Sequence, residues 1–110
     1  MTLYRQAWRM QLRRGSEAVY DTAHAQIWPE LIAEMRAGGV ETFVIYRSGL
    51  EVFAFQQRRT PFPGPATKPT QTMENWWLEM QPLMMTGIDG RPVREMLSEV
   101  FVLDHERTTT

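Results

Sequence analysis

The sequence predicts an α+β fold in which a four-stranded antiparallel sheet carries two helices on one face. Three features of the 110-residue chain lead to this expectation. Residues 3–12 alternate between apolar and polar side chains, as a half-buried strand does. Residues 40–55 hold two runs of β-branched and aromatic residues around a glycine-containing turn, which is typical of a hairpin. Apolar residues recur at helical spacing in residues 16–37 and 72–84, so with a last strand near the C-terminus the order is β-α-β-β-α-β, the ferredoxin-like arrangement.

The first predicted strand, residues 3–12, has one apolar and one polar face. The apolar face is made by Tyr4, Trp8, Met10 and Leu12. A turn at residues 13–15 follows the strand. Ser16 is then expected to cap a helix, because a serine hydroxyl can accept a hydrogen bond from the free N–H groups of the first turn.

A proline interrupts the helical stretch of residues 16–37. The apolar face of this stretch is made by Tyr20, His24, Ile27, Leu31 and Met35. Pro29 has no N–H to donate and its ring crowds the preceding turn, so either one helix kinks there or a second helix begins with Pro29 at its first position. Gly38 and Gly39 are expected to end the helix, because glycine readily adopts the left-handed backbone found at helix C-termini.

The predicted hairpin joins strands at residues 40–46 and 50–55 through the turn Arg47-Ser48-Gly49. Residues 60–70 contain four of the seven prolines of the chain. Proline is unsuited to helix interiors and central strands, so this segment is expected to be an extended loop.

The second predicted helix, residues 72–84, is expected to begin with Thr70 or Thr72 as its cap. Its predicted apolar stripe is made by Met73, Trp77, Met80 and Met84. Trp76 would then lie toward an edge of the helix, because adjacent helical residues point about 100° apart. The last strand is expected within residues 96–103 and ends in the run Glu99–Leu103.

Several predicted strands carry aromatic residues on both faces. Phe43 faces opposite to Tyr46, and Phe53 and Phe55 face opposite to Val52. A sheet with one face in water shows a cleaner alternation. We therefore expect a second sheet to cover the first, most simply in a C2 homodimer.

The composition indicates one domain, residues 1–104, followed by a polar tail at residues 105–110. Lys and Arg total 12 against 13 Asp and Glu, a net charge of −1 that leaves no basic excess for a nucleic-acid partner. The absence of cysteine excludes disulfides, cysteine-bound zinc, iron–sulfur clusters and thiol catalysis. No apolar run approaches the roughly 18 residues of a membrane span, and the first residues hold no apolar signal core. We therefore expect a cytoplasmic protein without membrane contact.

His24 is the candidate catalytic residue, and Tyr20 lies one helical turn before it. Residues four apart on a helix are neighbours. An imidazole that titrates near neutral pH beside a hydroxyl suits proton transfer to and from a polar substrate. The spacing alone is more often that of an amphipathic core, given the intermediate burial of both residue types. His105, the other histidine, lies in the polar tail and is assigned no role.

An indole at the edge of a helix offers a flat apolar surface and one N–H donor, and both suit the binding of a sugar. Trp76 could equally contact a dimer partner or lie at the core boundary, since tryptophan is enriched at both. The sequence shows no glycine-rich phosphate loop, and its histidines and carboxylates lack metal-ligand spacing.

The run of residues 20–31, YDTAHAQIWPEL, resembles the hallmark Y-x-x-x-H-x-x-I-W-P-E-L of the L-rhamnose mutarotase family. The later motifs Trp76-Trp77-x-x-Met80 and Glu99-Val100-Phe101 match the same family in the same order. The resemblance covers nearly the whole chain, and its first motif is long and specific.

The resemblance implies a dimeric α/β barrel that interconverts the α and β anomers of L-rhamnose, without a metal or an organic cofactor. It implies that the proton donor is His24 and that the sugar is contacted by Tyr20, Trp76 and Trp77. The chain departs from the family at Phe43, where the family usually has a sugar-contacting tyrosine. It also departs at residues 60–70, where the family has a polar helical segment. Phe43 is then expected in the pocket wall, and a related 6-deoxy sugar such as L-fucose stays open as the substrate.

Two interpretations from other classes of protein stay open. A ferredoxin-like dimer can bind a small ligand without catalysis, because a fold does not determine a function. A small cofactor-free oxygenase of the same architecture would place His24 and the tryptophans around an apolar pocket. Acceleration of anomer exchange by the purified protein separates the mutarotase from both.

Overall fold

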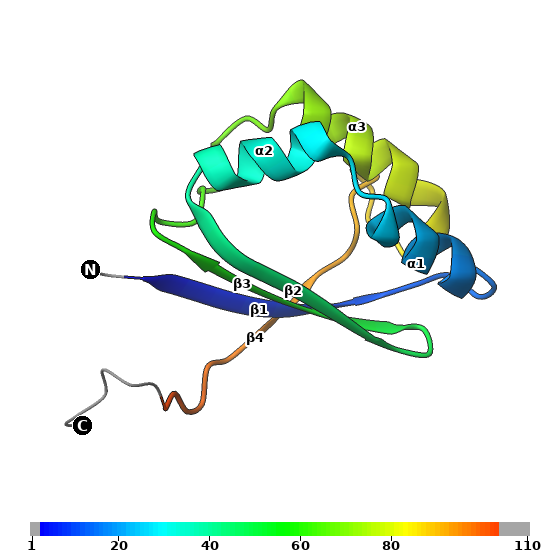
Figure 1. Cartoon of the computed structure of the whole chain (residues 1–110). Helices are drawn as coiled ribbons and strands as arrows, with labels where there is room; N and C mark the ends of the chain where they lie inside the picture. Colours follow the sequence, from blue (N-terminus) through cyan, green and yellow to red (C-terminus); the bar gives the residue numbers. More distant parts are fainter. Residues whose placement is uncertain (1–2, 104–110) are drawn as a thin grey trace.

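The computed structural model describes residues 3–103, and in this part of the chain three α-helices lie over one face of a four-stranded antiparallel sheet (Figure 1). The elements are β1 (Tyr4–Gln11), α1 (Glu17–Ala25), α2 (Pro29–Ala37), β2 (Val40–Ser48), β3 (Glu51–Arg58), α3 (Gln71–Met80), a 3-10 turn (Gln81–Leu83) and β4 (Glu95–Leu97). The strands are ordered β2-β3-β1-β4 in the sheet. With α1 and α2 taken as one helical segment, the order is β-α-β-β-α-β, so the predicted fold class is confirmed. The predicted domain end at residue 104 and the tail at 105–110 lie outside the described residues.

The face of the sheet under the helices is apolar because of how the strands pair. Trp8 of β1 lies opposite Ala54 of β3, and Ala54 lies opposite Ile45 of β2. Directly paired residues point to the same face of a sheet. Trp8 and Leu12 of the predicted apolar face are buried and Met10 is half-buried, whereas Tyr4 at its start is exposed, so the predicted face is confirmed except at Tyr4.

The hairpin of β2 and β3 is confirmed, but its turn is shorter than predicted. Ser48 pairs with Glu51, which leaves Gly49 and Leu50 as the loop. Gly49 has a φ of +59°, a left-handed value that glycine adopts without steric cost. Arg47 therefore lies within β2 and not in the turn where the sequence placed it.

A second helix begins at Pro29. α1 ends at Ala25, and Pro29 is the first residue of α2. Trp28 has a ψ of 128°, the extended conformation preferred by a residue that precedes proline. The two-helix alternative for this segment is thus confirmed. Ser16 occupies the N-cap position of α1 as predicted, but its side chain makes no capping hydrogen bond.

α3 is shorter than the predicted helix over residues 72–84. Its cap is Thr70, whose hydroxyl oxygen accepts a hydrogen bond of 3.1 Å from the N–H of Met73. The helix ends at Met80 because Pro82 cannot donate to a carbonyl of the preceding turn, and the chain continues as a 3-10 turn.

The apolar stripe of α3 differs from the predicted one. Trp76 and Met80 are its buried residues, while Trp77 is half-buried. The prediction that Trp76 lies at the edge is therefore wrong, whereas Trp77 packs against the core with Met73, as the predicted stripe requires. Residues three and four positions apart both lie on one face of a helix, so Trp76 and Trp77 can each share a face with Met73. The position of the sheet beneath α3 decides which of the two indoles is buried.

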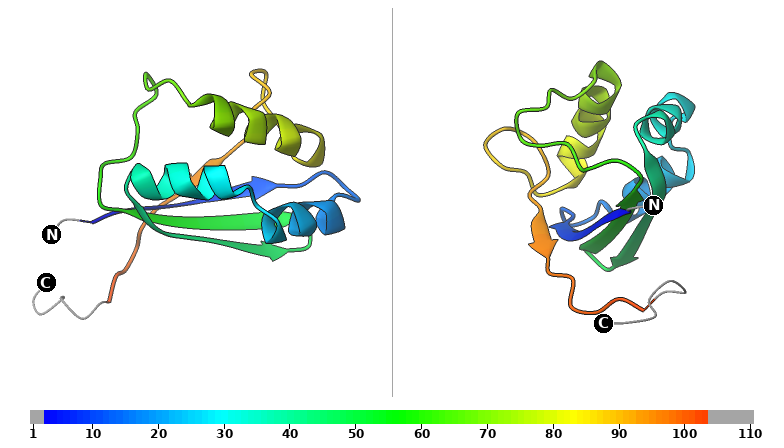
Figure 2. Two further views of the ribbon diagram at one scale, coloured as in Figure 1. Left: turned by 45° about the horizontal axis from the view of Figure 1, so that its top comes forward. Right: turned by 90° about the vertical axis from the view of Figure 1, so that its left-hand side faces the viewer.

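The core lies between the sheet and the helices. Its buried cluster consists of Leu12, Tyr20, Leu31, Val52, Trp76, Met80 and Met84. Figure 2 shows α2 and α3 lying next to each other above the strands. Because Tyr20 of α1 and Trp76 of α3 belong to the same cluster, packing fixes the relation between these two helices.

The last strand is much shorter than the predicted 96–103. β4 pairs with β1 only at Ala7, Trp8 and Arg9, and residues 98–103 then run on the side of the sheet opposite to the helices (Figure 2). Val100 is 92% exposed. The apolar pattern of this segment is that of a strand, but the ladder between β4 and β1 ends at Leu97, and beyond it the side chain of Glu99 accepts a hydrogen bond of 2.9 Å from Nε of Arg5.

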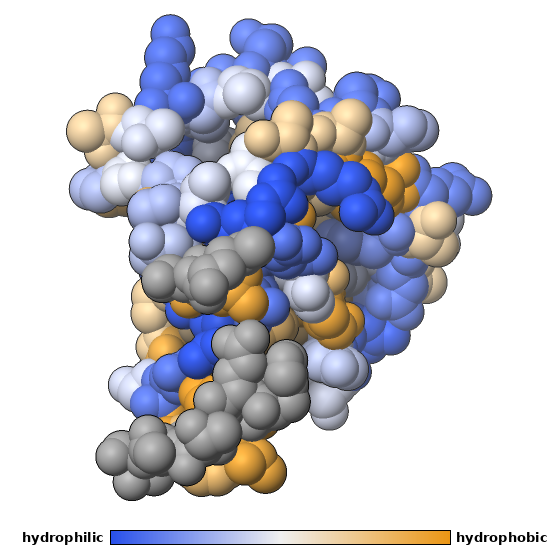
Figure 3. All heavy atoms as spheres, turned by 60° about the vertical axis from the view of Figure 1, so that its left-hand side comes forward, coloured by the Kyte–Doolittle hydropathy of each residue, from blue (hydrophilic) through white to orange (hydrophobic). Residues whose placement is uncertain are grey.

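The outer face of the sheet, which points away from the helices, carries exposed apolar side chains. Tyr46 and Phe53 pair across β2 and β3, and Tyr46 is 67% exposed. Figure 3 shows apolar surface next to hydrophilic surface on the side of the molecule that lies at the left of Figure 1. The prediction that aromatic residues lie on both faces is confirmed. Within residues 3–103, no helix has the length and apolar character that crossing a membrane requires.

Candidate active site

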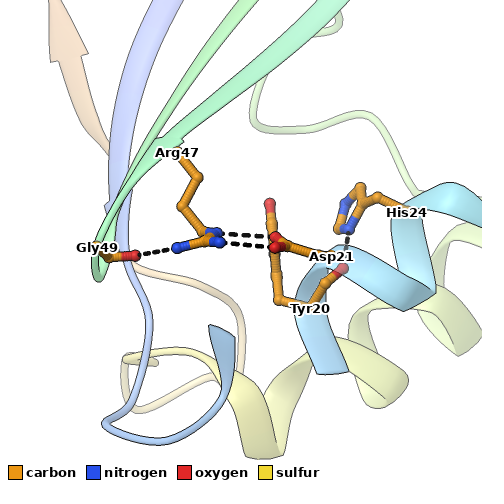
Figure 4. A network of polar contacts seen from close by, with 5 residues as sticks. All are labelled: Tyr20, Asp21, His24, Arg47 and Gly49. Carbon is orange, nitrogen blue, oxygen red and sulfur yellow. Dashed lines mark hydrogen bonds and ion pairs between the residues drawn. The ribbon is translucent and has the colours of Figure 1, made fainter. Parts of the chain in front are cut away.

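Helix α1 brings Tyr20 and His24 together on successive turns (Figure 4). Their ring centroids are 4.1 Å apart, with 35° between the planes. The Nδ1 atom of His24 lies 2.9 Å from the backbone oxygen of Tyr20. A carbonyl oxygen can only accept a hydrogen bond, so Nδ1 carries the hydrogen and Nε2 is the nitrogen that can exchange a proton.

Two indoles extend this pair of rings. His24 and Trp76 are 5.3 Å apart between ring centroids and meet edge to face at 85°. Trp28, in the linker between α1 and α2, meets Trp76 in the same way at 5.2 Å and 87°. Edge-to-face contacts between aromatic rings are favourable because ring edges and faces carry opposite partial charge. The imidazole is therefore oriented by a phenol on one side and by an indole on the other.

Burial changes the pKa of both titratable groups. Burial and the charge of Asp21 raise the pKa of Tyr20 to about 12, so its hydroxyl keeps its proton near neutral pH. Burial lowers the pKa of His24, against raising effects from the hydrogen bond to the Tyr20 backbone and from Asp21. The protonated imidazole is therefore a stronger acid than an unperturbed histidine, and its neutral form is favoured at pH 7.

The predicted contact residues Trp76 and Trp77 lie in different surroundings. Trp76 is 9% exposed and contacts His24. Trp77 is half-buried, and the guanidinium of Arg91 lies 4.5 Å from the centroid of its ring. The structure thus brings Trp76, and not Trp77, into ring contact with the candidate catalytic residue.

Phe43 lies on the face of the sheet that the helices cover. Its ring is 5.9 Å from the indole of Trp8, and the guanidinium of Arg94 lies 5.2 Å from that same indole. In the strand register, Phe43 is opposite Gln56, a buried polar residue whose side-chain oxygen accepts a hydrogen bond of 3.2 Å from Arg58. The sheet face around Phe43 therefore combines aromatic surface with an amide.

The sequence missed the polar residues of the sheet. The sequence predicts Arg47 in a turn, whereas in the structure its side chain binds Asp21 on α1. Gln56 follows the second predicted strand and was given no role. The sequence did contain a signal for these two residues. Both are polar residues on the inward-pointing side of otherwise apolar strands, and buried polar residues need hydrogen-bonding partners.

Comparison with known proteins identifies the family of the chain. A family model described as L-rhamnose mutarotase matches residues 5–103. The chain is 36% identical over 100 residues to an L-rhamnose mutarotase of Burkholderia orbicola, covering 89% of this chain and 96% of that protein. It is also 36% identical over 102 residues to one of Bacteroides thetaiotaomicron, covering 91% and 98%. The crystal structure of an L-rhamnose mutarotase from Formosa agariphila superimposes with a TM-score of 0.78 and 30% identity, covering 92% of this chain and 99% of that one.

The fold and these relatives together define an isomerase that acts on the anomers of carbohydrates. Within that class, the chain belongs to the L-rhamnose mutarotase family. The family resemblance recognised from residues 20–31 is thereby confirmed.

Proposed function

We propose that this chain interconverts the α and β anomers of L-rhamnose by general acid–base catalysis. One observation carries the proposal: His24 is held between Tyr20 and Trp76 with Nδ1 bound to a backbone oxygen. Within the described part of the chain, Nε2 of His24 has no hydrogen-bond partner. The names of the relatives, all L-rhamnose mutarotases, support the choice of sugar.

Mutarotation opens the pyranose to its aldehyde and closes it on the other face of the carbonyl. During opening, the bond between C1 and the ring oxygen breaks, protonated His24 gives its proton to the ring oxygen, and water takes the proton of the anomeric hydroxyl. During closure, the hydroxyl formed from the ring oxygen returns its proton to His24, and the protonated water returns its proton to the carbonyl oxygen. General acid–base help is worth roughly 10²- to 10⁴-fold in rate, which suffices for a reaction that already proceeds in water.

The sugar is held by the neighbouring rings in this proposal. The Tyr20 hydroxyl, which stays protonated, donates a hydrogen bond to a sugar oxygen. The indoles of Trp76 and Trp77 lie against apolar C–H groups of the ring, and Phe43 with Trp8 forms the opposite wall. The missing hydroxyl at Phe43 leaves the preference between L-rhamnose and a related 6-deoxy sugar to experiment.

We also propose that the active form is a C2 homodimer. The exposed aromatic residues of the outer face, Tyr46 and Phe53, would pack against the same face of a second copy. Residues 98–103 lie on that same side of the sheet and carry exposed apolar side chains, so a partner sheet would cover them as well. Such a dimer removes from water the apolar surface that the single chain leaves open.

Saturation-transfer NMR on L-rhamnose tests the proposed reaction. The wild-type protein should accelerate anomer exchange, and His24→Ala should reduce the exchange to the uncatalysed background with little change in the melting temperature. His105→Ala, a change of the other histidine of the chain, serves as the control and should keep the full rate. Full activity of His24→Ala would remove His24 from the mechanism.

The same measurement on other sugars separates the alternatives. Faster exchange of L-fucose than of L-rhamnose would make the related 6-deoxy sugar the substrate. A protein that accelerates none of these exchanges would instead be the binding module or the oxygenase that the fold also permits.

A further inference from the structure

Asp21 of α1 and Arg47 of β2 are joined by a two-point ion pair (Figure 4). Nε of Arg47 donates to Oδ1 of Asp21 at 2.8 Å, and Nη2 donates to Oδ2 at 2.6 Å. Nη1 donates to the backbone oxygen of Gly49 at 2.8 Å, in the turn that follows β2. All three nitrogens of the guanidinium are thus occupied, so its orientation is fixed from both the helix and the hairpin.

The strand register explains why the arginine reaches the helix. Arg47 lies opposite Val52, which is fully buried, so the side chain of Arg47 leaves the sheet on the face that the helices cover. The side chains of Arg47 and Asp21 are 27% and 51% exposed. Partly exposed ion pairs contribute little to stability, but a planar guanidinium that grips both oxygens of a carboxylate sets a definite geometry.

Helix α1 has few other anchors to the sheet. It is nine residues long, Tyr20 is its buried residue, and its capping position makes no side-chain hydrogen bond. Among residues 3–103, the pair of Asp21 and Arg47 is the only side-chain hydrogen-bonded link between α1 and a strand. Asp21 follows Tyr20 directly and precedes His24 by one turn, so a rotation of the helix about its axis would move all three residues together.

We propose that Asp21 and Arg47 are positioning residues of the active site, which fix the rotation of α1 so that Tyr20 and His24 meet the sugar. This inference rests on the proposed function, because it assigns the pair a part in the same reaction. Within residues 3–103, Arg47 makes no hydrogen bond or ion pair with His24 or Tyr20, so in this proposal it acts through Asp21. Its fork-shaped side chain, and not its charge alone, is what the role requires.

The charges around His24 provide a readout that packing alone would not change. Asp21 tends to raise the pKa of His24, and Arg47 lowers the pKa of Asp21 by binding it. The other groups against His24 are Tyr20 on α1, whose phenol is protonated, and Trp76 on α3, which is uncharged. Glu17, at the start of α1, acts on Arg47.

Three single variants separate geometry from charge. Arg47→Gln leaves the carboxylate uncompensated, so the pKa of His24 should rise, whereas Asp21→Asn leaves the guanidinium alone, so the pKa of His24 should fall. Arg47→Lys keeps the positive charge but cannot bind both oxygens, so the pKa of His24 should stay near the wild-type value. All three should lower kcat on the order of 10-fold to 100-fold, because misplacement of a catalytic group costs rates of that size.

The experiment measures kcat and KM by saturation transfer and the pKa of His24 by NMR titration of the imidazole without substrate. Glu41→Gln is the matched control, because it breaks the exposed pair of Glu41 and Arg59 at 3.4 Å and should change neither quantity. The double variant Asp21→Asn with Arg47→Gln should lose no more activity than the worse single variant, since both disrupt one interaction.

Wild-type kcat in folded Arg47→Lys, or equal pKa changes in Arg47→Gln and Asp21→Asn, would overturn the positioning role. Simple addition of the two losses in the double variant would overturn it as well. A wild-type protein that fails to accelerate anomer exchange would defeat the proposed function instead, and the imidazole titration would still report whether the pair acts on His24.

Discussion

The imidazole Nδ1 of His24 donates to the backbone oxygen of Tyr20 over 2.9 Å, one turn back along α1. This bond fixes which nitrogen of the imidazole carries the permanent hydrogen and which one exchanges a proton. The side chain of Tyr20 is buried in the core while its backbone oxygen holds the imidazole, so one residue both packs in the core and orients His24. The consequences can be measured.

Removal of one hydroxyl tests the part of Tyr20. Tyr20→Phe keeps the ring in the core and keeps the backbone oxygen that holds His24, so the melting temperature should change little. Loss of the hydrogen bond to the sugar should raise KM about 2- to 10-fold, as expected for a hydrogen bond worth about 0.5–1.5 kcal/mol. Unchanged KM and kcat would show that the phenol does not contact the sugar.

The pH dependence of the rate follows from the pKa of His24. Because donation to the ring oxygen requires the imidazolium, kcat/KM should fall as pH rises through the pKa of His24 in the free protein, which lies below the ordinary 6.5. Initial rates of exchange between pH 4.5 and 8 measure this limb, with the uncatalysed rate subtracted at each pH. A catalysed rate that instead rises across this range would assign His24 the part of a base.

The two tryptophans of α3 should respond differently to truncation. Trp76→Ala removes a core side chain and should lower the free energy of unfolding by about 3–5 kcal/mol. Trp77→Ala removes a half-buried ring and should cost less stability while raising KM. Thermal unfolding and saturation-transfer kinetics on both variants make the comparison. Equal stability losses would contradict the different burial of the two indoles.

A hydroxyl restored at Phe43 should improve recognition of L-rhamnose. Phe43 is partly exposed and lies opposite Gln56, so the added group of Phe43→Tyr has space and a polar neighbour. If Phe43 lies against the bound sugar, the new hydroxyl adds one hydrogen bond to it. KM for L-rhamnose should then fall several-fold, which corresponds to the usual net free energy of one hydrogen bond. The matched control is Tyr46→Phe, which removes a hydroxyl from the same strand but on the outer face of the sheet. This variant should leave KM unchanged.

A charge placed on the outer face should break the proposed dimer. Phe53→Glu would put a carboxylate into the apolar interface and yield a monomer by analytical ultracentrifugation. Leu78→Glu, on an exposed position of α3 on the helical side, is the control and should leave the dimer intact. A wild-type protein that is monomeric at micromolar concentration would exclude this assembly.

Local sequence determined most of the elements and the central pair of the site. The period-2 pattern of residues 3–12 and the turn at Gly49 suffice for strands, because each depends on neighbours in the chain. Pro29 dictates a helix start for a reason internal to its own ring. The meeting of Tyr20 and His24 is likewise local, since four residues of helix bring them together.

Tertiary structure alone decided which tryptophan is buried, where the last strand stops and what Arg47 binds. Each of these depends on a surface contributed by a distant segment: the sheet beneath α3, the edge of β1, and Asp21 on another element. Apolar residues spaced by three or by four positions can both lie on one helix face, so spacing alone does not identify the buried tryptophan. A segment with the pattern of a strand forms one only where it meets the edge of another strand. The sequence therefore specifies what each segment can do, and packing selects which of those possibilities minimises exposed apolar surface and unpaired charge.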